Sequence, residues 1–252
     1  MDEAQLKKHQ LAHSADAIQS RLLEPDKGHY LKDALLGSMD GCVTCFALIC
    51  GIYGAGYGYS VAIILGLASL FADGFSMATS NYFSTKSEQD KTNQLAKEEE
   101  KHIQIYPEGE KEEIRQIYFQ KGFSGDILEQ IVETITQDKK AWIETMLKED
   151  HGLSLNYANP IISGLVTMVA FVVLGIFPLI PLIFANNLNS VPFYLITLFT
   201  GIAFCTIGTV KAIAIKESIT KCILETLFVG AIAAIVAYSV SYYLKHYLLV
   251  GI

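Results

Sequence analysis

Charged residues are almost absent from three long stretches of the chain. These stretches are residues 34–85, 151–210 and 222–244. The only charged side chains within them are Asp40, Asp73 and Glu225. A helix on the surface of a soluble protein needs polar residues along its outward face, and these stretches do not supply them. The pattern therefore predicts an integral membrane protein.

The lengths of these stretches predict five membrane helices. About 20 apolar residues in helical form span a bilayer, and the first two stretches are each divided by turn residues: a glycine-rich segment at 53–60 and an asparagine-rich segment at 186–192. Membrane β-strands would instead show short segments of alternating hydrophobicity. The spans are expected near residues 34–54, 59–85, 160–184, 192–212 and 222–244.

The charges concentrate in one polar insert, residues 86–150, which holds 10 basic and 16 acidic residues. Its pattern predicts helices, the first continuing from the second span without a breaker to Tyr106-Pro107, as a rod about 70 Å long. The fold class is therefore an all-α integral membrane protein with five transmembrane helices and a helical domain inserted between the second and third. The expected regions are residues 1–33, an N-terminal segment; 34–85, the first two spans; 86–151, the inserted domain; and 152–252, the last three spans.

Composition alone would suit a soluble protein, since 51% of the 252 residues are hydrophobic and the net charge is −7. The distribution of basic residues is more informative, because it predicts the orientation of the protein in the membrane. Basic residues gather near the span ends in residues 1–33, in the insert and in the turn between the fourth and fifth spans, which predicts that these parts are cytoplasmic and that the C-terminus lies across the membrane. The acidic insert disfavours nucleic-acid binding. Residues 1–33 resemble neither a signal nor a transit peptide, and the short tails favour a prokaryotic plasma membrane over a vacuolar membrane.

Two carboxylates at membrane depth suggest a site, because such groups are costly there and usually functional. Met39 adjoins Asp40, and Met77 follows Asp73 by one helical turn. Carboxylate combined with thioether favours transition ions such as Fe²⁺, Mn²⁺ and Co²⁺ over Mg²⁺ and Ca²⁺. The alternatives are that the methionines only pack and that the carboxylates only join helices by hydrogen bonds. The five cysteines all fall in or at the ends of the spans and are interpreted as small buried thiols.

A second candidate site lies in the insert, where three pairs of residues have the spacing of neighbours on one helix face. The pairs are Glu99 and His102, Glu110 and Glu113, and Met146 and Asp150. If the helices pack together, these six side chains could converge on a divalent transition metal. The alternative is an ordinary solvated helix surface.

Several motifs, in this order and spacing, resemble the vacuolar iron transporter (VIT) family over nearly the whole chain from about Tyr30. They are Leu36-Gly37-x-x-Asp40-Gly41, Ser76-Met77-Ala78, Glu98-Glu99-Glu100, the run from Pro107 to Ile114, Pro160, Pro178-x-x-Pro181 and Leu224-Glu225-Thr226.

The resemblance implies a homodimer in the lipid bilayer that exports Fe²⁺, and often Mn²⁺, from the cytosol in exchange for protons. Co²⁺ and Zn²⁺ are further candidate ions. It implies that Asp40 and Met77 line the metal pathway and that a cytoplasmic metal-binding domain uses Glu99, Glu110, Glu113 and Met146. His102 and Asp150 stand where the family usually has Glu. Asn81 stands where many members have Glu, and Asp73 could replace that carboxylate.

Proton coupling could use Asp40, Asp73 or Glu225. Two other classes remain open: a membrane-anchored metal sensor, and a ferroxidase, since Glu99-x-x-His102 matches one element of di-iron helical bundles. Residues 86–150 contain no second such element, so we expect a transporter and not an enzyme.

Overall fold

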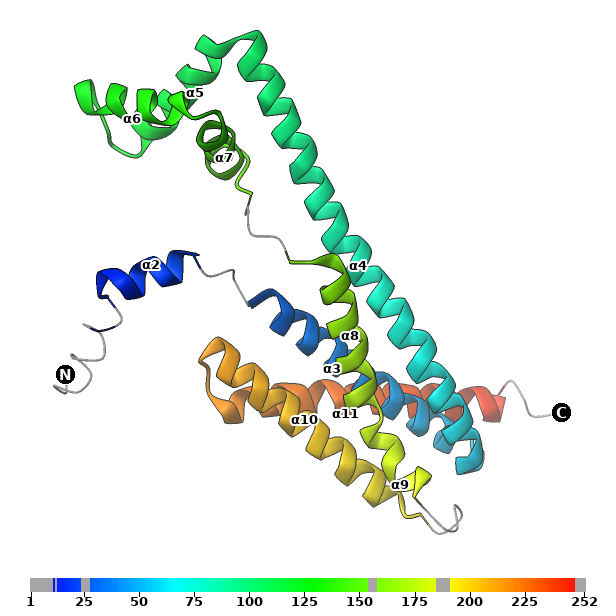
Figure 1. The fold of residues 1–252 in the computed structure, drawn as a ribbon. Helices are drawn as coiled ribbons and strands as arrows, with labels where there is room; N and C mark the ends of the chain where they lie inside the picture. The colour runs from blue at the N-terminus through cyan, green and yellow to red at the C-terminus, as the bar shows by residue number, and fades with distance from the viewer. Residues whose placement is uncertain (1–10, 12, 24–27, 154–157, 185–190, 248–252) are drawn as a thin grey trace.

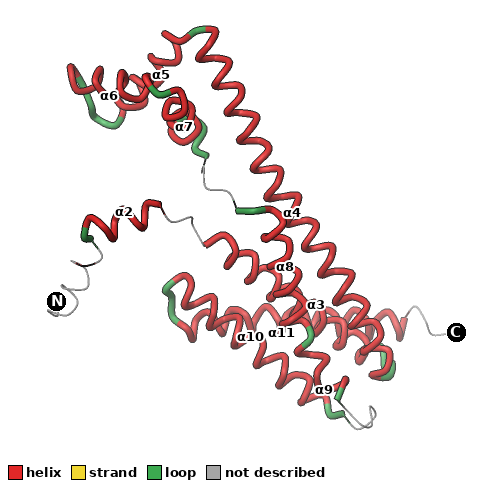
Figure 2. Tube along the Cα trace, viewed as in Figure 1, coloured by secondary structure: helices red, strands yellow, loops and turns green. Residues whose placement is uncertain are grey.

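The computed structural model describes residues 11, 13–23, 28–153, 158–184 and 191–247. These residues form helices joined by short loops, without a β-strand among them, as Figure 2 shows. The helices are α2 (Ala15–Leu23), α3 (Gly28–Gly54), α4 (Tyr59–Ile105), α5 (Pro107–Gln120), α6 (Gly125–Gln137), α7 (Lys139–Glu149), α8 (Pro160–Gly175), the 3₁₀ turn η1 (Phe177–Leu179), α9 (Ile180–Ile183), α10 (Phe193–Ile215) and α11 (Ile219–Tyr247). The predicted all-α class is confirmed.

Five helical segments of the described chain are long and apolar enough to cross a membrane, as the sequence predicts. They are Tyr30–Gly54, Tyr59–Ile105, Pro160–Ile183, Phe193–Ile215 and Ile219–Tyr247. The third differs from the single helix expected over 160–184, because α8 ends at Gly175 and a 3₁₀ turn intervenes before α9. Pro178 and Pro181 lie there, and proline has no backbone N–H to continue an α-helical ladder.

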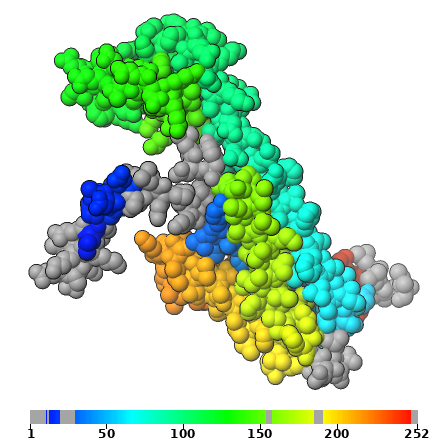
Figure 3. Space-filling view, viewed as in Figure 1, coloured from blue at the N-terminus to red at the C-terminus, as the bar shows by residue number. Residues whose placement is uncertain are grey.

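Helix α4 is a single rod, as predicted from the lack of a breaker between the second span and the insert. Its 47 residues correspond to about 70 Å, and it ends where Pro107 forces a new helix to begin. Figure 1 shows α4 running from the membrane bundle up to α5–α7, and Figure 3 shows these helices as a separate mass at its far end. Their small apolar core contains Ile114, Leu128, Val132, Trp142 and Met146.

Helix α3 lies at the centre of the membrane bundle and contacts α4, α8, α10 and α11. Its closest neighbour is α8, because two glycines remove the side chains between them. A Cβ atom at Gly37 would overlap the backbone of Thr167, and one at Gly41 would overlap the backbone of Phe171. Small residues of this kind allow membrane helices to approach closely.

We expect Gly41→Ala to destabilise the bundle by about 1–3 kcal/mol, because the added methyl group forces two backbones apart. The matched control is Gly201→Ala in α10, where an added Cβ meets nothing within 4 Å. Thermal unfolding in detergent measures both variants. Equal melting temperatures for the two would contradict the close packing of α3 on α8.

Candidate metal centres

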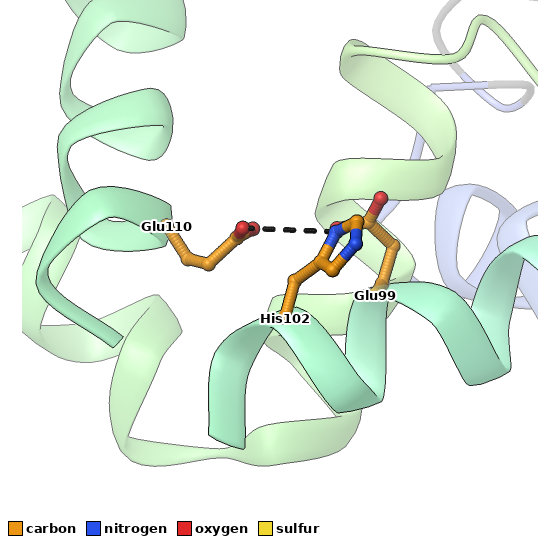
Figure 4. Close-up of side chains that lie close together, drawn as sticks. All are labelled: Glu99, His102 and Glu110. Carbon is orange, nitrogen blue, oxygen red and sulfur yellow. Dashed lines mark ion pairs between the residues drawn. The ribbon is translucent and has the colours of Figure 1, made fainter. Parts of the chain in front are cut away.

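A cluster of metal-ligand side chains lies where α4 meets α5. Glu99 and His102 come from the last turns of α4, and Glu110 comes from the first turn of α5. The chain reverses at Tyr106-Pro107, so these turns face each other. Each residue offers one ligand atom, and these atoms all lie within 4.8 Å of one another. Figure 4 shows the three side chains directed toward a common point, with His102 Nδ1 3.9 Å from Glu110 Oε1.

Two carboxylates of this cluster are buried. Glu99 is 5% exposed and Glu110 is 9% exposed. In the part of the chain that the structure describes, the Oε2 atom of each is buried without a hydrogen-bond partner. Burying such an oxygen unpaired is costly, and a bound cation would compensate that cost.

The electrostatics of the cluster also favour a cation. Burial raises the pKa of Glu110, and the neighbouring charges of Glu113 and Glu99 raise it further. Burial likewise raises the pKa of Glu113, helped by the charges of Asp150 and Glu99. Like charges held this close disfavour ionisation. A divalent ion would relieve the repulsion among all four carboxylates.

The six side chains predicted to converge therefore fall into three groups. Glu99, His102 and Glu110 meet directly, while Glu113 and Asp150 lie within electrostatic range of them. Met146 is 1% exposed and packs in the apolar core formed by α5–α7. Metal binding by these residues, and the cytoplasmic location of the domain, stay predictions.

The sequence analysis missed one residue of this cluster, His151. Its Nε2 atom lies 2.9 Å from Glu99 Oε1 and 3.8 Å from Asp150 Oδ2. His151 follows the end of α7, so no helical spacing connects it to the acidic pairs. In the sequence, His151 is marked only by its place between Asp150 and Gly152. In the structure, the backbone turns at Gly152 with φ +65°.

The two carboxylates of the predicted spans, Asp40 and Asp73, lie on α3 and α4, which contact each other. Asp40 and Asp73 interact electrostatically. Ser69 donates a hydrogen bond to the Asp73 carboxylate. Met39 and Met77 are partly buried and pack against the same core of the bundle. The role of these residues in a metal pathway stays a prediction.

Asn81 joins two helices. Its side-chain amide donates to Thr167 Oγ1 at 2.8 Å and to the Ser163 carbonyl at 3.3 Å, which ties α4 to α8. Both α8 residues are buried. Since Asn81 has no carboxylate, Asp73 is the only acidic residue in the apolar part of α4, residues 59–85.

Glu225 forms an ion pair with Lys211, with Oε2 2.7 Å from Nζ. The pair joins α10 to α11 and borders a cavity of about 280 Å³ that Met39 also lines. A proton-coupling role for Glu225 stays a prediction, and it would require this pair to open.

The fold defines a helical membrane protein, with a carboxylate in each of two apolar helices and a cluster of two glutamates and a histidine at the end of a long helix. The model of the VIT family matches residues 31–242. The chain belongs to the VIT family, and the resemblance noted in its motifs is confirmed.

Three relatives illustrate the relationship. A protein of Toxoplasma gondii named vacuolar iron transporter is 33% identical over 177 residues, covering 67% of this chain and 59% of the relative. Vacuolar iron transporter 1 of Arabidopsis thaliana is 28% identical over 222 residues, covering 87% and 88%. The vacuolar iron transporter of Plasmodium falciparum is 28% identical over 225 residues, covering 86% and 82%.

Proposed function

We propose that this protein transports Fe²⁺ across its membrane, out of the cytosol and in exchange for protons. The observation that carries the proposal is the continuity of α4, which bears both candidate metal sites. Asp73 and Met77 lie in its apolar part, and Glu99 and His102 lie at its far end, about 33–44 Å away along the axis. The names of the relatives support iron as the substrate.

The cluster of Glu99, His102 and Glu110 captures the ion first. Its buried, mutually repelling carboxylates gain most from a divalent cation. Carboxylate and imidazole ligands suit Fe²⁺ and also Mn²⁺, Co²⁺ and Zn²⁺. Mn²⁺ is therefore a second candidate substrate. A surface that concentrates cations beside the membrane also raises the rate at which they enter a pathway.

Asp40 and Asp73 then supply oxygen ligands inside the membrane, with Met39 and Met77 as nearby sulfur ligands. Two carboxylates can replace part of the hydration shell that the ion leaves behind. A proton that binds to one of them weakens the metal site, because a carboxylate must be deprotonated to bind metal. This competition is the proposed basis of exchange.

The remaining features of the proposal concern assembly and orientation. A homodimer would place Asp40 and Met77 of both chains around one axis. Residues 28–33, the α5–α7 region and the turn after α10 would face the cytosol, following the distribution of basic residues. The relatives are named vacuolar, which gives no support to a prokaryotic plasma membrane. We propose only a membrane that borders the cytosol.

The test is Fe²⁺ uptake into sealed proteoliposomes with an acidic lumen and an internal pH dye, with iron kept reduced. We expect Fe²⁺ entry accompanied by alkalinisation of the lumen, and neither signal in liposomes without protein. Fe²⁺ entry without a pH change would contradict proton exchange. Metal binding by the protein without any flux would contradict transport and would favour the sensor or ferroxidase alternatives.

A further inference from the structure

His151, which follows the end of α7, contacts the cluster formed by Glu99, His102 and Glu110. Its Nε2 atom lies 2.9 Å from Oε1 of Glu99. An ionised carboxylate can only accept hydrogen bonds, so the hydrogen of this bond belongs to Nε2 of the imidazole. The contact leaves Oε2 of Glu99 buried and unpartnered within the described chain, and therefore available to a cation.

We propose that His151 is a positioning residue, which holds Glu99 in the orientation that captures the metal ion. The proposal rests on the proposed capture of metal by Glu99, His102 and Glu110. In metal sites, a carboxylate ligand is commonly held by a hydrogen bond from outside the ligand set, and losing such a partner weakens metal binding by about 10–100-fold. Nothing in the resemblance to the VIT family assigns this role to His151.

The backbone of the α7 terminus fixes where His151 can act. Its own N–H donates to the Met146 carbonyl at 3.2 Å, and the N–H of Leu153 donates to the Leu147 carbonyl at 2.9 Å. Gly152 supplies the positive φ that this turn requires. The side chain is thereby directed across to α4, on which α7 packs.

The imidazole of His151 is surrounded by carboxylates, as expected for a side chain that donates a hydrogen bond to one of them. Its imidazole side chain is 29% exposed, whereas the side chain of Glu99 is 7% exposed. Asp150 Oδ2 lies 3.8 Å from the same nitrogen, and Glu113 interacts with the imidazole electrostatically. His151 thus contacts Glu99 through Oε1, while one ligand atom from each of Glu99, His102 and Glu110 lies within 4.8 Å of the other two.

The experiment is a Co²⁺ titration of the purified full-length protein in detergent, with the dissociation constant and the visible d–d absorption band as readouts. We expect His151→Phe to raise the dissociation constant about 10–100-fold. We expect His151→Gln, whose side-chain amide can donate from a similar position, to recover most of that loss and to keep the wild-type band. Repeating the titration in an Asp40→Ala, Asp73→Ala background removes both intramembrane carboxylates from the measurement.

The possible results distinguish failure of the positioning role of His151 from failure of metal capture by the cluster. If His151→Phe binds Co²⁺ like the wild type while Glu99→Gln loses binding, the positioning role is overturned and metal capture stands. If His151→Gln loses affinity as fully as His151→Phe and its band shifts, the imidazole is itself a ligand and the positioning role is again overturned. If the wild type fails to bind Co²⁺, metal capture itself fails. His151→Ala replaces His151→Phe should the larger side chain disturb folding, as judged by circular dichroism.

Discussion

Replacing Asp40 with alanine is expected to abolish Fe²⁺ flux while metal capture by Glu99, His102 and Glu110 continues. Asp40 lies in the apolar part of α3 and interacts electrostatically with Asp73 of α4. A cation that enters a bilayer interior needs charged or polar ligands there to replace its hydration water. Loss of a residue that only holds a metal ligand in place weakens metal binding or activity by about 10–100-fold. Asp40 is proposed as a ligand itself, so we expect a loss of flux of at least about 100-fold in proteoliposomes.

Two control variants separate charge from packing in this prediction. Asp40→Asn keeps the size of the side chain and removes its charge, and it should fail in transport as Asp40→Ala does. Asp126→Ala removes an exposed carboxylate in the first turn of α6 and should transport at the wild-type rate. Flux within about twofold of wild type in the Asp40 variants, which is a barrier change under about 0.5 kcal/mol, would place the pathway elsewhere.

Much of the fold could be predicted from the sequence because a bilayer imposes a simple, long-range constraint. A membrane-spanning helix must be apolar over about 20 residues, with its backbone groups hydrogen-bonded internally. The 60 residues from 151 to 210 contain no charged side chain, as this constraint requires. Helix ends are less predictable. Helix α11 extends to Tyr247, past the predicted end at 244, because a helix can continue into the interface after its apolar stretch stops.

The candidate sites could be predicted only as far as one helix determines them. Helical spacing brought Glu99 and His102 together, since both lie on α4. The partners of Asn81 lie 82 and 86 residues away on α8, and the Lys211–Glu225 pair joins two different helices. Such contacts depend on packing between helices, which no local pattern records. His151 was missed because it lies outside any helix and therefore has no periodicity.

The second large effect is expected from Glu99→Gln, which should remove metal-induced stabilisation of the protein. A ligand that binds only the folded state at about 100 times its dissociation constant adds about 2.7 kcal/mol to the free energy of unfolding. Glutamine keeps the volume of Glu99 and can still accept a hydrogen bond from His151, but it lacks the charge that the ion requires. Thermal unfolding in detergent with and without Mn²⁺, which resists oxidation, measures the difference.

Glu98→Gln is the matched control, because it makes the same chemical change one residue earlier on the exposed side of α4, where Glu98 bonds Gln94. It should retain the full shift in melting temperature on adding Mn²⁺. A shift retained by both variants would show that the ion binds elsewhere, and a shift lost by both would indicate a diffuse electrostatic effect of the acidic surface. Loss in Glu99→Gln alone would assign the binding to the buried carboxylate, whose Oε2 atom has no partner within the described chain.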